Sequence, residues 1–256
     1  MPRYFIEVAY KGTRYAGFQV QQNANTIQGE VKKAFDTLFG ASVLSSSKEG
    51  WQGTGSSRTD AGVHALQNFF HFNWPEDLDP KKIYNLNAIL PRDIAIKSIR
   101  KVTSEAHCRF DAISRTYHYQ IYQQKNPFLT DIAYFYPYPL DINRLNEAAE
   151  LLKIYTNFTS FSKRNTQVHN FNCTIFDSRW FQNGNTLIYE VRANRFLRGM
   201  VRALTATMLK VGRGIIDMNS FKEIIQQQDA TRAFFDTPPQ GLFLINVELP
   251  EKVFLK

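Results

Sequence analysis

Hydrophobic and polar residues alternate along several short stretches of this chain, and a period of two is typical of half-buried β-strands. The stretch YFIEVAY at residues 4–10 is one example. Asn183 and Gly184 separate two others and favour a tight hairpin between them. The pattern predicts strands at residues 4–10, 66–73, 93–102, 115–122, 173–181, 186–193 and 241–249.

In other stretches the hydrophobic residues are three or four positions apart, as on one face of an α-helix. The first predicted helix begins at Asn25 or Thr26, since either can cap it, and ends at Gly40. Asp79 and Asp141 are typical N-caps of two further helices. The predicted helices cover residues 25–39, 80–90, 142–152, 195–211 and 220–228.

Strands and helices are mixed in both halves of the chain, and hairpins join neighbouring strands. This pattern predicts an α+β fold with largely antiparallel sheets. The second half repeats the type of arrangement seen in the first without visible sequence identity. A chain of 256 residues can form one large domain or two small ones, and as two α/β halves it would divide into residues 1–112 and 113–256.

The composition favours a globular protein, because 43% of the 256 residues are hydrophobic and 21% are charged. No apolar run is long enough to span a membrane, and the N-terminus lacks a signal-peptide layout, so a cytoplasmic protein is expected. The net charge of +8 indicates a polyanionic partner, most commonly nucleic acid. Two cysteines without a CxxC pair and five histidines without ligand spacing predict neither a metal site nor a disulfide framework.

The stretch SRTDAGVHA at residues 57–65 combines an acid, a base and small residues. Ala61 and Gly62 after Asp60 allow a tight turn and the close approach of a ligand to the carboxylate. Asp60 has two interpretations from these residues alone. It either bonds its own backbone in an Asx-turn, or it is a catalytic carboxylate in a loop that leads into a strand.

RTDAGVHA resembles the signature of the tRNA pseudouridine synthase A family. Residues 10–21 resemble the family's YxGxxYxGWQxQ element, with Phe18 in place of tryptophan. Residues 109–119 resemble RFxAxxRxYxY, and residues 196–203 resemble FLxxMVRN, with Ala203 in place of asparagine. Residues 237–244 resemble APxxGLxL, with Thr237 in place of alanine. Together these elements extend the resemblance over nearly the whole chain.

The resemblance implies a role for five residues of this chain. Asp60 would be the catalytic aspartate and Arg202 its ion-pair partner. Tyr117 would stack on the target base, Leu242 would face that base, and Arg58 would contact the RNA near the flipped nucleotide. Arg58 is also an alternative partner of Asp60, and ordinary strand core is an alternative role for Leu242.

Two basic segments are candidates for RNA binding. Lys11 and Arg14 lie in a glycine-bounded loop, which is otherwise an ordinary solvated hairpin. Arg195 and Arg198 precede Arg202 at helical spacing, and the interval 191–216 contains six basic residues and no acidic one. Such a stripe is either a solvated helix face or, as the missing acids favour, a phosphate-binding surface.

The resemblance also implies an activity and an architecture. The activity is the isomerisation of uridine to pseudouridine at positions 38 to 40 of the tRNA anticodon arm, without a metal or cofactor. The architecture is a pair of pseudo-symmetric halves whose sheets join around a central RNA-binding cleft, in a homodimer. Two alternatives are a catalytically silent RNA-binding protein and an N-glycosidase that uses Asp60 to release the free base.

Overall fold

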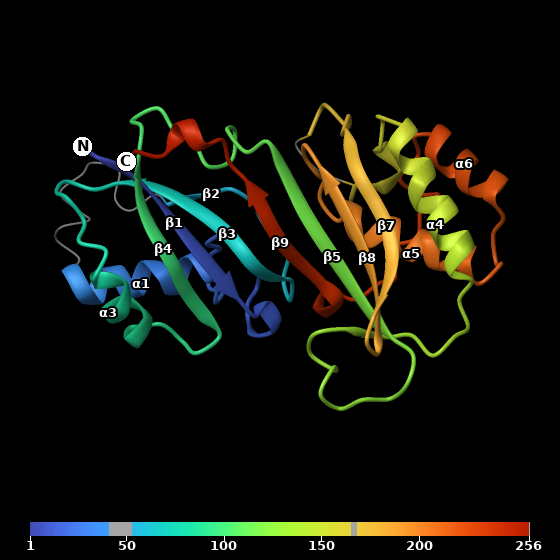
Figure 1. Ribbon diagram of the computed structural model, residues 1–256, viewed down its shortest axis with the longest axis horizontal. Helices are drawn as coiled ribbons and strands as arrows, with labels where there is room; N and C mark the ends of the chain where they lie inside the picture. The colour runs from blue at the N-terminus through green and yellow to red at the C-terminus, as the bar shows by residue number, and fades with distance from the viewer. Residues whose placement is uncertain (41–52, 165–167, 256) are drawn as a thin grey trace. The chain divides into compact units, whose positions relative to one another are not determined.

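The computed structural model describes residues 1–40, 53–164 and 168–255. The chain packs into two compact units, Met1–Ile113 with Leu244–Lys256, and Ser114–Phe243. Both units combine helices with mainly antiparallel strands, which confirms the predicted α+β class (Figure 1). The halves 1–112 and 113–256 remain a prediction, and the chain from Leu244 onwards packs with the N-terminal unit.

In the N-terminal unit, strand β1 (Arg3–Tyr10) lies between β4 (Ile94–Val102) and β3 (His64–Asn73). Both neighbours run antiparallel to it. The short β2 (Thr54–Gly55) pairs with β3. Strand β9 (Leu242–Glu248) follows β3 in the strand order.

Helices α1 (Ile27–Phe39) and α3 (Lys82–Ile89) belong to this unit. Of the two candidate caps of α1, Thr26 is the one used, because its hydroxyl accepts the backbone N–H of Gly29. The prediction that α3 begins at Pro80 was wrong. Asp79 accepts the N–H of Lys81 in a turn, and the helix begins at Lys82.

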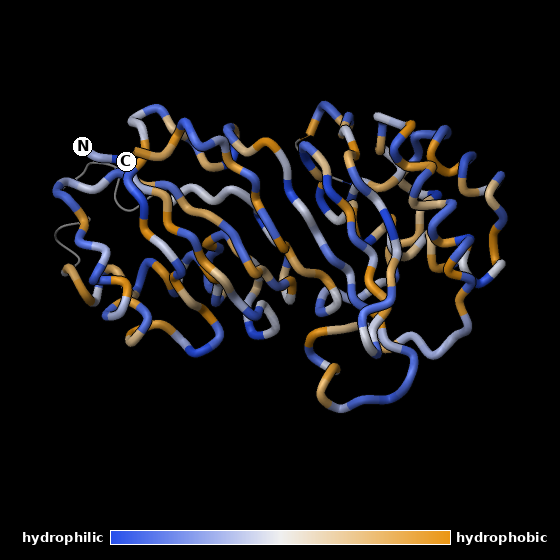
Figure 2. The backbone as a smooth tube through the Cα atoms, in the orientation of Figure 1, coloured by the Kyte–Doolittle hydropathy of each residue, from blue (hydrophilic) through white to orange (hydrophobic). Residues whose placement is uncertain are grey.

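The core of the unit lies where α1 meets the sheet. The Phe35 ring of α1 packs edge-on against Phe72 and Trp74, at 5.6 and 6.0 Å between ring centroids. Hydrophobic and hydrophilic residues alternate along the outer strand β4 (Figure 2), whereas Phe69–Phe72 of the central strand β3 are buried in succession, so both faces of β3 are covered. This alternation is the pattern from which the strands were predicted.

In the C-terminal unit, β8 (Thr186–Ala193) lies between β5 (Ser114–Tyr122) and β7 (Ile175–Asn183) and runs antiparallel to both. Gly184 has a φ of +54° in the β7–β8 turn, which confirms the predicted hairpin. The short β6 (Tyr134–Phe135) runs parallel to β5. The helices are α4 (Ile142–Leu151), α5 (Met200–Gly212) and α6 (Met218–Gln226), and the predicted cap Asp141 accepts two N–H groups of α4.

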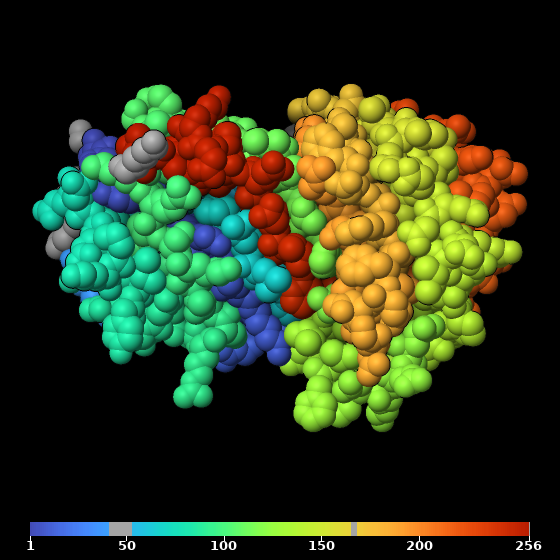
Figure 3. Space-filling model, viewed as in Figure 1, coloured from blue at the N-terminus to red at the C-terminus, as the bar shows by residue number. Residues whose placement is uncertain are grey.

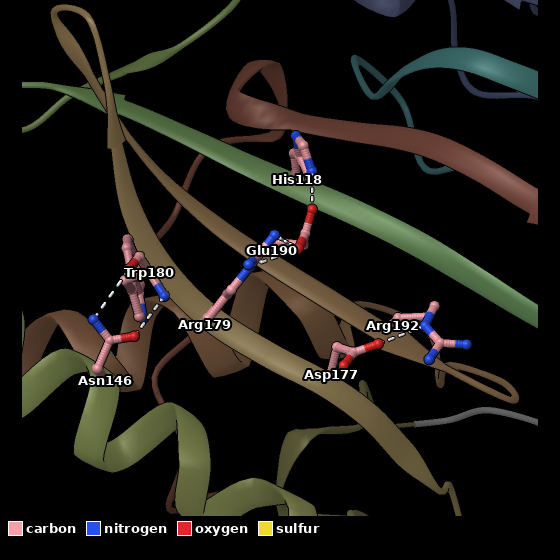
Figure 4. Close-up of polar contacts among 7 residues, drawn as sticks. All are labelled: His118, Asn146, Asp177, Arg179, Trp180, Glu190 and Arg192. Atoms are coloured by element: carbon pink, nitrogen blue, oxygen red, sulfur yellow. Dashed lines mark hydrogen bonds and ion pairs between the residues drawn. The ribbon is translucent and has the colours of Figure 1, made fainter.

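One face of this sheet is polar. His118, Glu190 and Arg179 lie side by side across β5, β8 and β7, with 2.8 Å between their bonded atoms (Figure 4). An adjacent residue on each strand points to the opposite face, where Tyr119, Tyr189 and Trp180 are buried. Because Tyr117 is two residues from Tyr119, it also points to this second face.

Helix α5 begins at Met200, so the predicted start at Arg195 was wrong. Gly199 has a φ of +74°, a left-handed conformation that interrupts a right-handed helix and suits glycine. Arg195 and Arg198 therefore lie in the segment before α5 and form no helical stripe with Arg202. Among the helices of the described residues, none combines the length and the apolar character needed to cross a membrane.

Candidate active site

Asp60 begins a tight turn in the loop that leads into β3. Its carbonyl oxygen accepts the N–H of Val63 at 3.2 Å. Gly62, the third residue of the turn, has a φ of +77°, which explains the glycine at this position. The side chain of Asp60 is partly exposed at the start of this turn. The predicted loop that feeds a strand is therefore present.

The Asp60 loop is fixed on the glycine-bounded segment 11–17. The N–H of Gly62 binds the carbonyl oxygen of Tyr15 at 3.3 Å, and the N–H of Phe18 binds that of Thr59 at 3.1 Å. His64 of the RTDAGVHA stretch accepts the N–H of Gly12 through Nδ1 at 2.9 Å. These bonds join two segments that both resemble family motifs and hold the carboxylate on a fixed backbone.

A buried network of polar side chains joins the loop to β1 and β3. The hydroxyl groups of Thr59 and Tyr10 are 2.7 Å apart. The side-chain amide of Asn68 on β3 donates to the Tyr10 hydroxyl at 3.1 Å and to the Ser57 carbonyl at 2.9 Å. Sequence reasoning missed this network. The available signal was that Tyr10 and Asn68 are polar groups within predicted strands.

Gly12 makes the closest approach to this loop, and its replacement by alanine should destabilise the protein. A Cβ atom at residue 12 would overlap the carbonyl oxygen of Val63. We expect Gly12→Ala to cost about 1–3 kcal/mol of folding free energy, as overpacking generally does. Denaturant titration measures this loss. Thr13→Ala, at an exposed neighbouring residue, is the control, and equal midpoints for the two variants would contradict the packing.

Arg14, a predicted RNA-binding residue, already has a carboxylate partner. Its Nε lies 2.7 Å from Asp93, and the hydroxyl of Tyr15 donates to the same carboxylate at 2.6 Å. Burial alone would raise the pKa of Asp93, but the hydrogen bonds from Arg14 and Tyr15 lower it overall. Arg14 is nevertheless mostly exposed, as is Lys11. The segment thus presents two exposed cations, Lys11 and Arg14. Asp93, which the sequence analysis missed, holds Arg14 and Tyr15 in place.

Arg58 is exposed two residues before Asp60. Phe18, which replaces the family's tryptophan, is fully buried instead and stacks on Phe70 at 4.5 Å. The aromatic residue of this motif is therefore a core residue in this chain.

In the C-terminal unit, Tyr117 lies on the helix side of β5. Its ring meets Phe196 edge-on, with 5.0 Å between the centroids. Tyr119 is fully buried and donates its hydroxyl to the carbonyl of Pro238 at 2.6 Å, so it is a packing residue. Tyr117 is the more exposed ring of this pair, as a stacking role requires.

Arg202 of α5 is held by Thr237. Its Nε and Nη2 both donate to the Thr237 carbonyl, at 2.8 and 2.6 Å, and the Thr237 hydroxyl donates to the Arg202 carbonyl at 2.8 Å. Two bonds to one oxygen fix the plane of the guanidinium, and Nη1 takes part in neither bond. Leu242, at the start of β9, is buried with 7% of its surface exposed. The hydroxyl of Thr237 was visible in the sequence only as a departure from the family pattern.

The segment before α5 carries Arg195 and Arg198. The carbonyl of Arg198 accepts the N–H of Lys163 at 2.9 Å, and the Lys163 side chain lies against Gly199. Burial raises the pKa of Cys173 to about 11, an effect that the charge of Arg195 partly offsets. Two other cations of the interval 191–216 have acidic partners from elsewhere in the chain, namely Arg192 with Asp177 and Lys210 with Asp236.

The predicted site residues are divided between the two units. Lys11, Arg14, Arg58 and Asp60 belong to the N-terminal unit, and the others, Tyr117, Arg195, Arg198, Arg202 and Leu242, belong to the C-terminal unit. Within each unit they are held by the contacts described above. In the described part of the chain, no group of three or more His, Cys, Asp or Glu side chains is placed to hold a metal ion.

Comparison with known proteins gives full-length relatives. A family model described as tRNA pseudouridine synthase matches residues 149–250. The tRNA pseudouridine synthase A of Parabacteroides distasonis is 41% identical over 99% of this chain and 98% of its own length. That of Porphyromonas gingivalis is 43% identical over 100% of both chains. That of Staphylococcus aureus is 32% identical over 99% of this chain and 94% of its own length.

Proposed function

Because the chain belongs to the tRNA pseudouridine synthase A family and is an isomerase that acts on tRNA uridine, we propose that Asp60 is its catalytic carboxylate. We further propose that the target uridines lie at positions 38 to 40 of the anticodon arm. The observation that carries the first proposal is the Asp60 turn, which presents a carboxylate on a backbone fixed from two sides. Ala61 and Gly62 follow it, and small residues allow a ligand to approach the carboxylate closely.

The reaction exchanges one bond for another within a single nucleotide. The bond from C1′ of the ribose to N1 of uracil breaks, the base turns, and C1′ joins C5 while C5 loses its proton. Atoms and electrons balance without an added oxidant or reductant. Asp60 would meet the developing positive charge at the sugar, form a covalent adduct or take a proton, as carboxylates do in glycoside chemistry.

The resemblance assigns further roles to residues of the C-terminal unit. Arg202 would pair with the Asp60 carboxylate through the Nη1 side of its guanidinium, since the opposite edge is engaged by Thr237. Tyr117 would receive the face of the flipped base, and Leu242 would bound the pocket. Arg58 would hold the RNA beside the flipped nucleotide.

Release of tritium from tRNA labelled at C5 of uridine tests the proposed activity. Isomerisation expels that hydrogen and yields no free base. A catalytically silent RNA-binding protein releases no tritium, and an N-glycosidase yields free uracil. Primer extension after carbodiimide treatment then locates pseudouridine in the product, and modification only outside the anticodon arm would contradict the proposed target.

Tyr117 gives a prediction about base stacking. Tyr117→Phe should keep tRNA binding and most of the single-turnover rate, because the ring face remains. Tyr117→Ala should weaken productive docking by about 1–3 kcal/mol, the contribution of one base–aromatic stack. Single-turnover rates over a range of protein concentrations measure this effect. Equal rates for Tyr117→Ala and wild type would remove Tyr117 from the stacking role.

Arg195 and Arg198 give a prediction about salt. If each contacts a phosphate, replacement by alanine should reduce the slope of log affinity against log salt concentration by up to about one unit. Turnover at saturating tRNA should change little. Lys222→Ala, at an exposed residue of α6, is the charge-matched control. Unchanged slopes for both arginine variants would mean that these side chains are merely solvated.

We also propose a cytoplasmic location, where tRNA substrates are found, and a homodimer. Light scattering coupled to size-exclusion chromatography distinguishes a dimer from a monomer of 29.6 kDa.

A further inference from the structure

Phe110 is the outermost of three rings that contact one another in a tilted stack on the surface of the N-terminal unit. Its ring lies 4.2 Å from that of His107, at an angle of 31°, and the His107 ring lies 4.3 Å from that of His71, at an angle of 58°. His71 is buried in β3, whereas 74% of Phe110 is exposed. The stack thus begins in the sheet and ends in a ring that is largely open to solvent.

The segment that carries Phe110 is held by its own hydrogen bonds. The N–H of His107 donates to the Asp111 carboxylate at 2.8 Å, and the N–H of Asp111 returns to the His107 carbonyl at 3.0 Å. Nδ1 of His107 accepts the N–H groups of Arg109 and Phe110 at 3.2 and 3.3 Å. A ligand that stacks on Phe110 would therefore lose little affinity to the ordering of this segment.

Strand β4 leads into this segment, which runs beside the C-terminal turn Glu251–Val253, and the N–H of Thr103 binds the Val253 carbonyl at 2.9 Å. The chain after β4 (green) and the C-terminal residues (red) both lie at the surface of the N-terminal unit (Figure 3).

Two arginines and the Asp111 carboxylate lie close to the stack, and the surroundings shift both histidines towards the neutral form. Burial lowers the pKa of His71 to about 4 and also lowers the pKa of His107. Arg3 lies close by, since its Nη1 binds the Ala106 carbonyl at 3.0 Å. The Arg109 guanidinium lies 5.7 Å from the centre of the Phe110 ring. By contrast, the Arg100 guanidinium lies only 3.7 Å from the centre of the Phe254 ring. Arg109 therefore covers the Phe110 ring less closely than Arg100 covers the Phe254 ring.

We propose that Phe110 stacks on an unpaired base of the bound tRNA outside the catalytic pocket, with Arg109 beside the phosphate of that nucleotide. This site rests on the proposed function and extends it. Exposed rings next to arginines are the usual means of holding single-stranded nucleic acid, because every base has a π-face and every nucleotide a negative charge. A protein partner would favour a wider apolar surface, whereas Arg109 beside Phe110 is charged and exposed.

The test measures the affinity of the full-length protein for an unmodified tRNA transcript. Phe110→Ala should bind about 5- to 150-fold more weakly, the effect of losing one base–aromatic stack, with an unchanged salt slope. Phe110→Trp should bind at least as well as wild type. Arg109→Ala should reduce the salt slope by up to about one unit. Thermal unfolding of each variant checks the fold, which the removal of a mostly exposed ring should leave intact.

Tyr84 offers a matched control. It is 81% exposed on α3, in the same unit, and within the described residues no ring is stacked on it. Tyr84→Ala should bind tRNA within about two-fold of wild type, since loss of an ordinary surface side chain has little effect. If Phe110→Ala matched this control, the stacking site would be overturned.

Two further results would also overturn the site. If Phe110→Leu bound as well as wild type, the contact would be apolar rather than a stack. If Phe110→Ala changed the mass in solution but not the affinity for tRNA, the surface would be a contact between subunits. Tritium release by the wild-type protein is measured in the same preparations. Its absence defeats the proposed function, whereas unchanged affinity of Phe110→Ala with an active wild type defeats only the stacking site.

Discussion

Asp60→Asn should remove isomerisation while leaving tRNA affinity within a few-fold of wild type. Asparagine has the shape of aspartate and can keep the turn, but its amide can neither attack as a nucleophile nor accept a proton as a base. We expect the single-turnover rate to fall by at least the ~10²–10⁴-fold that one acid or base contributes. Tritium release under single-turnover conditions measures the rate, and a filter-binding titration measures the affinity.

Asp177→Asn is the matched control for this variant. Asp177 is a partly exposed carboxylate paired with Arg192 on the polar face of the C-terminal sheet, opposite to the face that carries Tyr117. Its loss should leave the single-turnover rate unchanged. Isomerisation by purified Asp60→Asn at the wild-type rate would end the assignment of Asp60.

The sequence predicted the elements that depend on neighbouring residues. Asp141 caps α4, and Gly184 allows the β7–β8 hairpin, because both effects act within a few residues. The strands followed from the alternation of buried and exposed positions, which the pleat of a sheet imposes wherever one face is covered.

The start of α5 shows where local patterns fail. Arg195, Arg198 and Arg202 have helical spacing, but spacing does not reveal the backbone conformation of Gly199, whose positive φ ends the pattern before Met200. Pairing across long sequence separations was equally hidden. The acid that holds Arg14 is Asp93, which lies 79 residues away, and only the fold brings the two together.

The candidate site combines both kinds of feature. The sequence pointed to Asp60 and Arg202 through resemblance to motifs, because a short motif contains the candidate residues themselves. The structure adds the groups that fix them, namely the network of Thr59, Tyr10 and Asn68 and the clamp of Thr237 on Arg202. Such supporting groups come from several elements, so no short motif contains them.

Arg202→Ala should lower the chemical step far more than tRNA binding. If Arg202 compensates the Asp60 carboxylate beneath the bound substrate, its loss disfavours the ionised form that the reaction needs. We expect a decrease in the single-turnover rate of up to roughly 1000-fold, because the covering substrate raises the pKa of the carboxylate and the lost opposite charge no longer lowers it by about 1–3 units. The slope of log affinity against log salt should barely move, in contrast to the Arg195 and Arg198 variants.

Thr237 provides a graded version of the same experiment. Thr237→Val removes the hydroxyl bond to the Arg202 carbonyl and keeps the carbonyl that holds the guanidinium. We expect a rate decrease of about five-fold, the equivalent of one hydrogen bond of ~1 kcal/mol, and Thr237→Ser should restore it. Thr205→Val on α5 removes a buried bond of the same kind, from Thr205 to the Val201 carbonyl, and is the control for stability. Equal rates for Thr237→Val and Thr205→Val would show that Thr237 only stabilises the fold.

Arg202→Ala has an outcome that would contradict its predicted role. If this variant kept the wild-type single-turnover rate and lost about one unit from the slope of log affinity against log salt, Arg202 would be a phosphate ligand. Arg58 would then be the next candidate partner of Asp60.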